Sequence, residues 1–294
     1  MRLMLFGLVF LAGILSIALD HAAAGDSRAQ QLIKQTRAAL GGEEALKSVR
    51  SLTLSGKLRR YDRSGELKIL FLLPDKFKKS ETMGLIADIE LTLTNTLNGS
   101  EVWTDSRTEG GAGARVNSRQ VDQGGGAQNP AARAQLMRQE FARDMIALLL
   151  ASPPSVPVEF TYAGQAEAKD GRADVLDVKG PDGFSARLYL DQTTHRPLLM
   201  QYKGVVPRVS VNTTTQAGGR EDVDKILKDA RTKQGPGARQ EGDLETHFSD
   251  YRAVDGIMLP HRITKSANGK LSEEWDIKKY KVNPPLSAGD FEKK

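Results

Sequence analysis

The sequence has no cysteine among its 294 residues. The fold therefore contains no disulfide, and a cysteine nucleophile, a thiolate metal site and a lipid anchor on an N-terminal cysteine are all excluded. A protein without disulfides must be held together by its apolar core, and a chain of this length can bury a large one.

Motifs for catalysis and cofactor binding are also missing. There is no H-E-x-x-H metal pattern, no G-x-S-x-G nucleophile elbow and no dinucleotide fingerprint, and no G-K-S/T follows the glycine-rich stretch. His195, His247 and His261 are scattered along the chain. We expect no catalytic residue, no metal and no cofactor, and hence no enzyme. The alternative is an uncharacterised active site assembled from distant residues.

Charge of one sign is only slightly in excess. Lys and Arg number 42 and Asp and Glu 37, which gives a net charge of +5. A mild excess is compatible with approach to an anionic surface such as lipid headgroups. No basic groove interleaved with aromatic residues is visible, so we expect no nucleic acid as a partner.

The N-terminus has the pattern of a cleavable secretory signal. Arg2 precedes an apolar run of 17 residues, and Ala22-Ala23-Ala24 provides a small-residue cleavage site. We predict a signal peptide over residues 1–24 with cleavage after Ala24. An uncleaved membrane anchor is the alternative, but the run is short for a spanning helix and contains Gly7 and Gly13. The remaining 270 residues are expected in the periplasm, free in solution and monomeric.

Behind the signal, the chain is mostly short alternating segments that predict strands. Residues 88–98 show the cleanest alternation, and Asn98-Gly99 predicts a hairpin turn. Two longer helices are predicted, over residues 27–40 and 131–150, and short ones over 43–49 and 221–232. In the second long helix, Met137, Phe141 and Met145 recur at helical spacing and form an apolar face.

Two polar stretches interrupt this pattern, at about residues 104–130 and 205–242. The first is rich in glycine and is predicted to be a mobile loop from residue 108 onward. We interpret both stretches as insertions in one domain that spans residues 25–294.

Together these features predict a mainly β (α+β) fold. About ten to twelve short antiparallel strands joined by tight turns are typical of a curved sheet that forms an incomplete β-barrel. Such a sheet has more apolar concave surface than its own side chains readily fill, so we expect helices to cover it.

The order of short motifs resembles that of the LolA/LolB superfamily of outer-membrane lipoprotein-sorting proteins. The matching residues span nearly the whole chain after the signal except the two insertions: Ala39-Leu40-Gly41-Gly42, Val49, Ser51-Leu52 and Gly56, Pro74-Asp75-Lys76-Phe77, Asn98-Gly99 with Val102-Trp103, Tyr162 and Gly164, Gly171, Asp174 and Val175, Leu188-Tyr189-Leu190-Asp191 with Thr194 and Pro197, Phe248, Asp250-Tyr251, Asp255-Gly256, Leu259-Pro260, Asn283 and Phe291. The resemblance implies an incomplete barrel whose helices cover a hydrophobic cavity, in a protein that carries or senses acylated molecules in the periplasm.

The leading hypothesis is a non-catalytic carrier or binding protein for lipids or acylated lipoproteins, with a role in outer-membrane biogenesis. Each buried methylene contributes about 0.8 kcal/mol, so an apolar half-barrel needs no other chemistry to hold an acyl chain. The predicted binding residues are those of the cavity and of the helix over it: Ile69, Phe71, Ile89, Leu91, Leu93, Met137, Phe141 and Met145. The alternative is a regulatory or assembly module that docks a protein partner at the inner or outer membrane.

Overall fold

The computed structural model describes residues 27–60, 63–86, 89–110, 116–118, 130–168, 171–206 and 241–293. The predicted signal peptide and the helix expected over residues 221–232 lie outside these ranges. None of the described helices is both long enough and apolar enough to cross a membrane.

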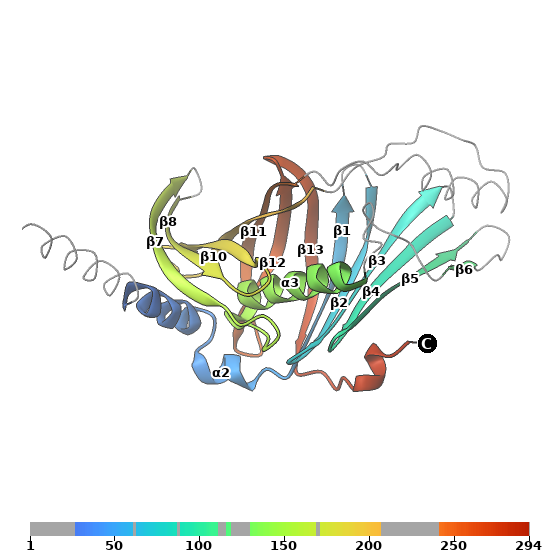
Figure 1. Cartoon of the computed structure of the whole chain (residues 1–294), viewed down its shortest axis with the longest axis horizontal. Coiled ribbons are helices and arrows are strands. Elements are labelled where there is room, and N and C mark those ends of the chain that lie inside the picture. The colour runs from blue at the N-terminus through green and yellow to red at the C-terminus, as the bar shows by residue number, and fades with distance from the viewer. Residues whose placement is uncertain are drawn as a thin grey trace, which may run out of the picture.

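One antiparallel sheet of 13 strands dominates the fold, in the order β6-β5-β4-β3-β2-β1-β13-β12-β11-β10-β9-β8-β7. It curls around its inner face without closing, because β6 and β7 lie at opposite edges (Figure 1). The predicted incomplete barrel is confirmed. The strands are β1 Ser51–Arg60, β2 Arg63–Leu72, β3 Lys76–Ile86, β4 Ile89–Asn98, β5 Glu101–Glu109, β6 Val116–Ser118, β7 Glu159–Ala168, β8 Gly171–Lys179, β9 Ser185–Asp191, β10 Pro197–Val205, β11 Glu241–Val254, β12 Ile257–Ala267 and β13 Lys270–Val282.

Tight turns explain why consecutive strands are neighbours. Asn268 and Gly269 both have positive φ, 50° and 73°, which is the conformation of a two-residue hairpin turn between β12 and β13. The first and last strands also pair, Leu52 with Val282. This β1–β13 pairing shifts register at Gly56, where a Cβ would lie 2.1 Å from the Asp276 carbonyl oxygen, so a side chain there would push the strands apart.

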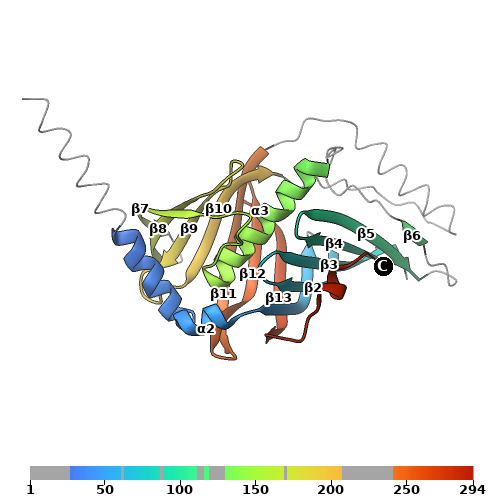
Figure 2. The ribbon, with the colours of Figure 1, turned by 60° about the horizontal axis from the view of Figure 1, so that its bottom comes forward.

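The long helix lies on the inner face of the sheet, and the shorter α2, Glu43–Ser48, lies at its lower edge (Figure 1). A helix over residues 27–39 leads into α2, and the long helix α3, Pro130–Leu149, runs across the inner face from the β3–β5 side toward β11 and β12 (Figures 1 and 2). The helices predicted over 27–40, 43–49 and 131–150 are confirmed. Helices and strands share one hydrophobic core, in which Leu32, Leu54 and Phe141 are buried together.

A short C-terminal segment packs on the outer face of the sheet. The 3-10 helix η1, Ala288–Phe291, contacts β3 and β4, and Phe291 is fully buried there. Lys78 Nζ donates to the Asp290 carbonyl at 2.7 Å, and Lys293 lies over the Trp103 ring at 5.1 Å.

The structure contains two strands that the sequence pattern did not predict, β3 and β6. Strand β5 also runs to Glu109, into the range that we interpreted as the first insertion. The sequence pattern did not reveal β3 because two of its inward positions are charged: Lys79 and Glu81 lie between Phe77 and Met83.

Candidate functional site

Helix α3 fills the space enclosed by the curved sheet. Phe141 is fully buried, with its ring centroid 6.1 Å from that of Phe71 and 5.9 Å from that of Phe77. Met137 and Met145, one turn away on either side, are buried in the same core. The apolar face predicted for this helix therefore packs against the strands β2 and β3.

Five of the eight predicted binding residues meet in this core: Ile69, Phe71, Met137, Phe141 and Met145. The other three, Ile89, Leu91 and Leu93, are only half-buried and do not belong to the core. They lie on the same face of β4 as the buried Leu97, but toward the opposite end of the strand, where Leu93 pairs with Glu81 and Ser106.

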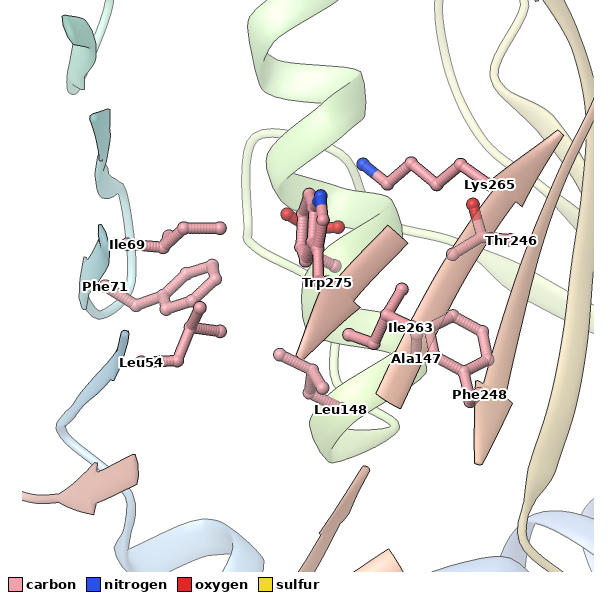
Figure 3. A pocket seen from close by; sticks show the side chains of 11 residues that line it. Leu54, Ile69, Phe71, Ala147, Leu148, Thr246, Phe248, Ile263, Lys265 and Trp275 are labelled. Carbon is pink, nitrogen blue, oxygen red and sulfur yellow. The ribbon is translucent and has the colours of Figure 1, made fainter. Parts of the chain in front are cut away.

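The open apolar cavity that we expected is closed in this structure. Between α3 and the sheet there remains a cavity of about 10 Å³, room for at most one water molecule. Leu54, Ile69 and Phe71 face it from β1 and β2, and Ile263 and Phe248 from β12 and β11, while Lys265 and Thr246 mark its polar end (Figure 3). The apolar volume is thus occupied by the side chains of α3.

Polar contacts connect α3 to strands and turns of the sheet. Arg133 donates to Thr104 on β5, and Gln135 and Gln139 donate to the carbonyl oxygen of Asp182 in the β8–β9 turn, at 2.8 and 3.2 Å. The guanidinium of Arg143 lies 4.1 Å from the centre of the Tyr202 ring. The helix is therefore tied to both halves of the sheet.

A network of ion pairs lies on the inner face beside this apolar core. Lys79 Nζ is 2.9 Å from Glu81 Oε1 and 3.1 Å from Glu140 Oε1 on α3. Arg60 bridges Glu81 and Glu273 at 2.9 and 2.6 Å. The side chains of Glu81 and Lys79 are only 4% and 10% exposed, so most of this network has been removed from water.

The network continues around Trp275. Its indole nitrogen donates to Glu273, and Lys265 Nζ lies 4.0 Å from the centre of its ring and 4.0 Å from Glu273 Oε1. Lys79 Nζ lies over the same ring at 5.2 Å. A cation over an indole face is attracted by the ring, so Trp275 helps to stabilise both ammonium groups.

The pKa values of the network show which effect dominates. Burial alone would raise the pKa of Glu81, but Lys79 and Arg60 hold it at about 2. Burial alone would lower the pKa of Lys79, but Glu140 and then Glu81 and Glu273 raise it well above its usual value. The paired groups are thus charged throughout the physiological range.

Asp144 is a carboxylate of the same region whose pKa is raised and not lowered. It lines the cavity one turn after Glu140 on α3, and its Oδ2 is buried and accepts no hydrogen bond from the described part of the chain. Burial raises the pKa of Asp144 from 3.8 to about 6, and Lys265 offsets only part of this effect. Glu140 raises the pKa further, whereas Lys79 and Arg143 lower it.

This difference predicts how stability depends on pH. Because the folded pKa of Asp144 lies above its usual value, its ionisation destabilises the fold near neutral pH, and stability should rise as the pH falls from about 7 to 4.5. Glu81 has the opposite shift, so its contribution is lost as the pH falls from 4.5 toward 2. Urea unfolding across this range should therefore show a maximum near pH 4.5–5.

Replacing Asp144 with asparagine should remove the first limb of this pH profile. The variant should be about 1–2 kcal/mol more stable than the unmodified protein at pH 7.5, with little change between pH 7 and 5. The control variant is Asp177→Asn, since Asp177 is only partly buried and pairs with Arg187 at 2.8 Å. An Asp144→Asn profile that still rises on acidification would contradict this assignment.

Metal-binding geometry is not apparent in the described ranges, where no three His, Cys, Asp or Glu side chains are grouped to hold an ion. His261 is buried, with Nδ1 3.1 Å from the Leu259 carbonyl and its ring against Tyr280. These contacts account for His261 as a core residue.

The fold and the site define an open antiparallel half-barrel with a helix across its inner face. Neither a family model nor a curated protein sequence matches the chain. Among solved structures it is similar to a DUF1329 family protein from Desulfovibrio piger, with 10% identity, a TM-score of 0.44 and coverage of 90% of this chain and 97% of that one.

Two further structures are similar. A LolA superfamily protein from Nitrosomonas europaea matches with 10% identity, a TM-score of 0.39 and coverage of 90% and 97%. MucB matches with 10% identity, a TM-score of 0.25 and coverage of 92% of this chain and 64% of that chain. The superfamily that the sequence motifs resemble is thus among the structural matches.

Proposed function

We propose that this chain is a periplasmic, non-catalytic carrier or binding protein for lipids or acylated lipoproteins. In the bound state, an acyl chain lies on the inner face of the sheet in place of the apolar side chains of α3. A partner protein at the inner or outer membrane delivers or receives this ligand. In the structure described above, the side chains of α3 fill this place.

The observation that supports this proposal is the apolar part of the inner face that lies beneath a single helix. Leu54, Ile69 and Phe71 face Phe248 and Ile263 across the remaining cavity, and side chains of α3 and Trp275 lie between these two walls (Figure 3). If α3 moved outward, the space now filled by Phe141 and Met145 would become an apolar groove.

Burying an acyl chain and withdrawing the apolar side chains of α3 involve free energies of similar size. A chain of about twelve methylenes contributes on the order of 10 kcal/mol when it is buried, at about 0.8 kcal/mol each. Each large side chain that α3 withdraws gives up about 1.5–3 kcal/mol. An acyl chain can therefore replace the four or five largest side chains of the helix at little net cost.

Half-buried apolar residues indicate where a ligand would enter. Ile89, Leu91 and Leu93 lie at the end of β4 away from the core, and Leu136 on the first half of α3 is 41% exposed. We assign these residues to the entrance and Ile69, Phe71, Met137, Phe141 and Met145 to the interior of the site.

Tethering α3 tests the proposal. Because the chain has no cysteine, Gln139→Cys and Asp182→Cys introduce the only two thiols, at positions that are joined by a hydrogen bond and lie away from the apolar face. A short bis-maleimide bridge should reduce uptake of the neutral apolar probe N-phenyl-1-naphthylamine at least tenfold. The same protein alkylated with N-ethylmaleimide should bind the probe normally.

Lipid extraction of the purified protein provides the second readout. Mass spectrometry should find acylated molecules in the unbridged protein. Absence of both bound lipid and probe uptake, together with a stoichiometric protein partner in a pull-down, would favour the regulatory or assembly module instead.

A further inference from the structure

The charges on the inner face are not fully compensated. Three cations, Arg60, Lys79 and Lys265, face three glutamates, Glu81, Glu140 and Glu273, and the distances between them are 2.6–4.0 Å. Asp144 adds a fourth carboxylate, and none of the ion pairs within the described ranges includes it. When Asp144 is ionised, these seven groups carry one excess negative charge. A further cation, Arg143, also lowers the pKa of Asp144, but its guanidinium lies over the rings of Phe184 and Tyr202.

The unpaired carboxylate lies on α3 and lines the cavity, so it faces the groove that would form if α3 moved outward. Asp144 lines the cavity together with the apolar residues Leu54, Ile69 and Phe71 and with the hydroxyl-bearing Thr246. Its Oδ2 is buried without a hydrogen-bond donor from the described residues. An ionised carboxylate only accepts hydrogen bonds, so a ligand group that satisfies Oδ2 must be a donor.

Lys265 also lines the cavity, but its charge is already balanced. Its ammonium group lies over the Trp275 ring and near Glu273, both at 4.0 Å. An anionic group placed beside Lys265 would also approach Asp144 and Glu140, and like charges in a poorly solvated space repel strongly. The local charge therefore favours a cation.

We infer that the ligand is an amphiphile with an ammonium group, which Asp144 binds while the alkyl or acyl chain lies along the apolar wall. This inference rests on the proposed function and specifies its ligand class. The ammonium group supplies the missing donor, cancels the excess negative charge and gains a second contact at Thr246. Burial also raises the pKa of Asp144 to about 6, and no described residue donates a hydrogen bond to its Oδ2.

Competition between three matched amphiphiles tests the inference at pH 7.5. Dodecylammonium, dodecanoate and dodecanol share a chain length and differ in head-group charge, and each is titrated against bound N-phenyl-1-naphthylamine. Dodecylammonium should displace the probe at a concentration at least tenfold lower than dodecanoate. Asp144→Asn should remove most of that preference, while dodecanol should still displace the probe, which shows that the site is intact.

Asp177→Asn is the matched control, since Asp177 is an aspartate on β8 that pairs with Arg187 away from the cavity, and it should keep the preference. Equal displacement by amine and acid, stronger displacement by dodecanoate, or an unchanged preference in Asp144→Asn would overturn the inference and leave the carrier function standing. Failure of all three amphiphiles would overturn the carrier function itself. As a second measurement, dodecylammonium should lower the pKa of Asp144 in a carboxyl NMR titration.

Discussion

Replacing Lys79 with methionine should lower the free energy of unfolding by about 3–5 kcal/mol, the usual cost of removing one partner from a buried ion pair. Lys79 lies within 3.1 Å of both Glu81 and Glu140, so its loss leaves two carboxylates short of their counter-charge. Arg60 still compensates part of the charge of Glu81, but Glu140 has no other ion pair among the described residues. Chemical denaturation at pH 7 measures the effect.

Lys203→Met is the control for this prediction. Lys203 also pairs with a carboxylate, Asp243, but its side chain is 73% exposed, so the change should cost less than about 1 kcal/mol. The double variant Lys79→Met, Glu140→Gln should recover part of the lost stability. It also removes one of the two carboxylates that Lys79→Met leaves without a counter-charge. If the free energy of unfolding of Lys79→Met falls by less than about 1 kcal/mol, water solvates the unpaired carboxylates and the prediction is wrong.

The second large effect concerns Phe141. Its replacement by alanine should cost about 3–5 kcal/mol, since the ring is fully buried between Phe71 and Phe77 and leaves a cavity behind. If α3 can detach while the sheet stays folded, the loss of stability should be confined to the helix. Hydrogen exchange should then accelerate over residues 130–149 and stay nearly unchanged in β1 and β13.

Probe uptake should respond in the same variant. Phe141→Ala should take up N-phenyl-1-naphthylamine several-fold faster, because the helix opens more often and leaves more room behind. Leu136→Ala, on the exposed side of the same helix, should change neither exchange nor stability by more than about 0.5 kcal/mol. Exchange that accelerates equally in α3 and in the sheet would show that the helix is an integral part of the core.

The fold could be predicted because apolar and polar residues alternate in most strands and recognisable turn sequences follow them. Residues 88–98 became β4, and Asn98-Gly99 became the turn between β4 and β5. The apolar face of α3 was equally readable, since Met137, Phe141 and Met145 recur at helical spacing. These features depend on neighbours in the chain, which is the information that a single sequence carries.

The ion network was not predicted, and the reason is physical. Lys79 and Glu81 occupy inward positions of β3, where a sequence pattern leads one to expect apolar residues, and their partners come from β1, β13 and α3. A charge at such a position is stable only if distant residues supply its counter-charge. Nothing in the spacing of Arg60, Glu140 and Glu273 reveals that they meet.

The assignment of Leu91 and Leu93 shows a second limit. Alternation correctly placed them on the inner face of β4, but it does not indicate which end of a strand lies under the covering helix. In the structure, the buried end is that of Leu97, which pairs with Phe77, and the opposite end is half-exposed.

The pairing of β1 with β13 also has a consequence for how the chain folds. Leu52 and Val282 are 230 positions apart, whereas the other strand pairs described here join consecutive strands of the chain. Each meander can therefore form from local hairpins, while the pairing between them carries a large loop-closure entropy. We expect this pairing to form last, so that its formation rather than the hairpins limits the folding rate.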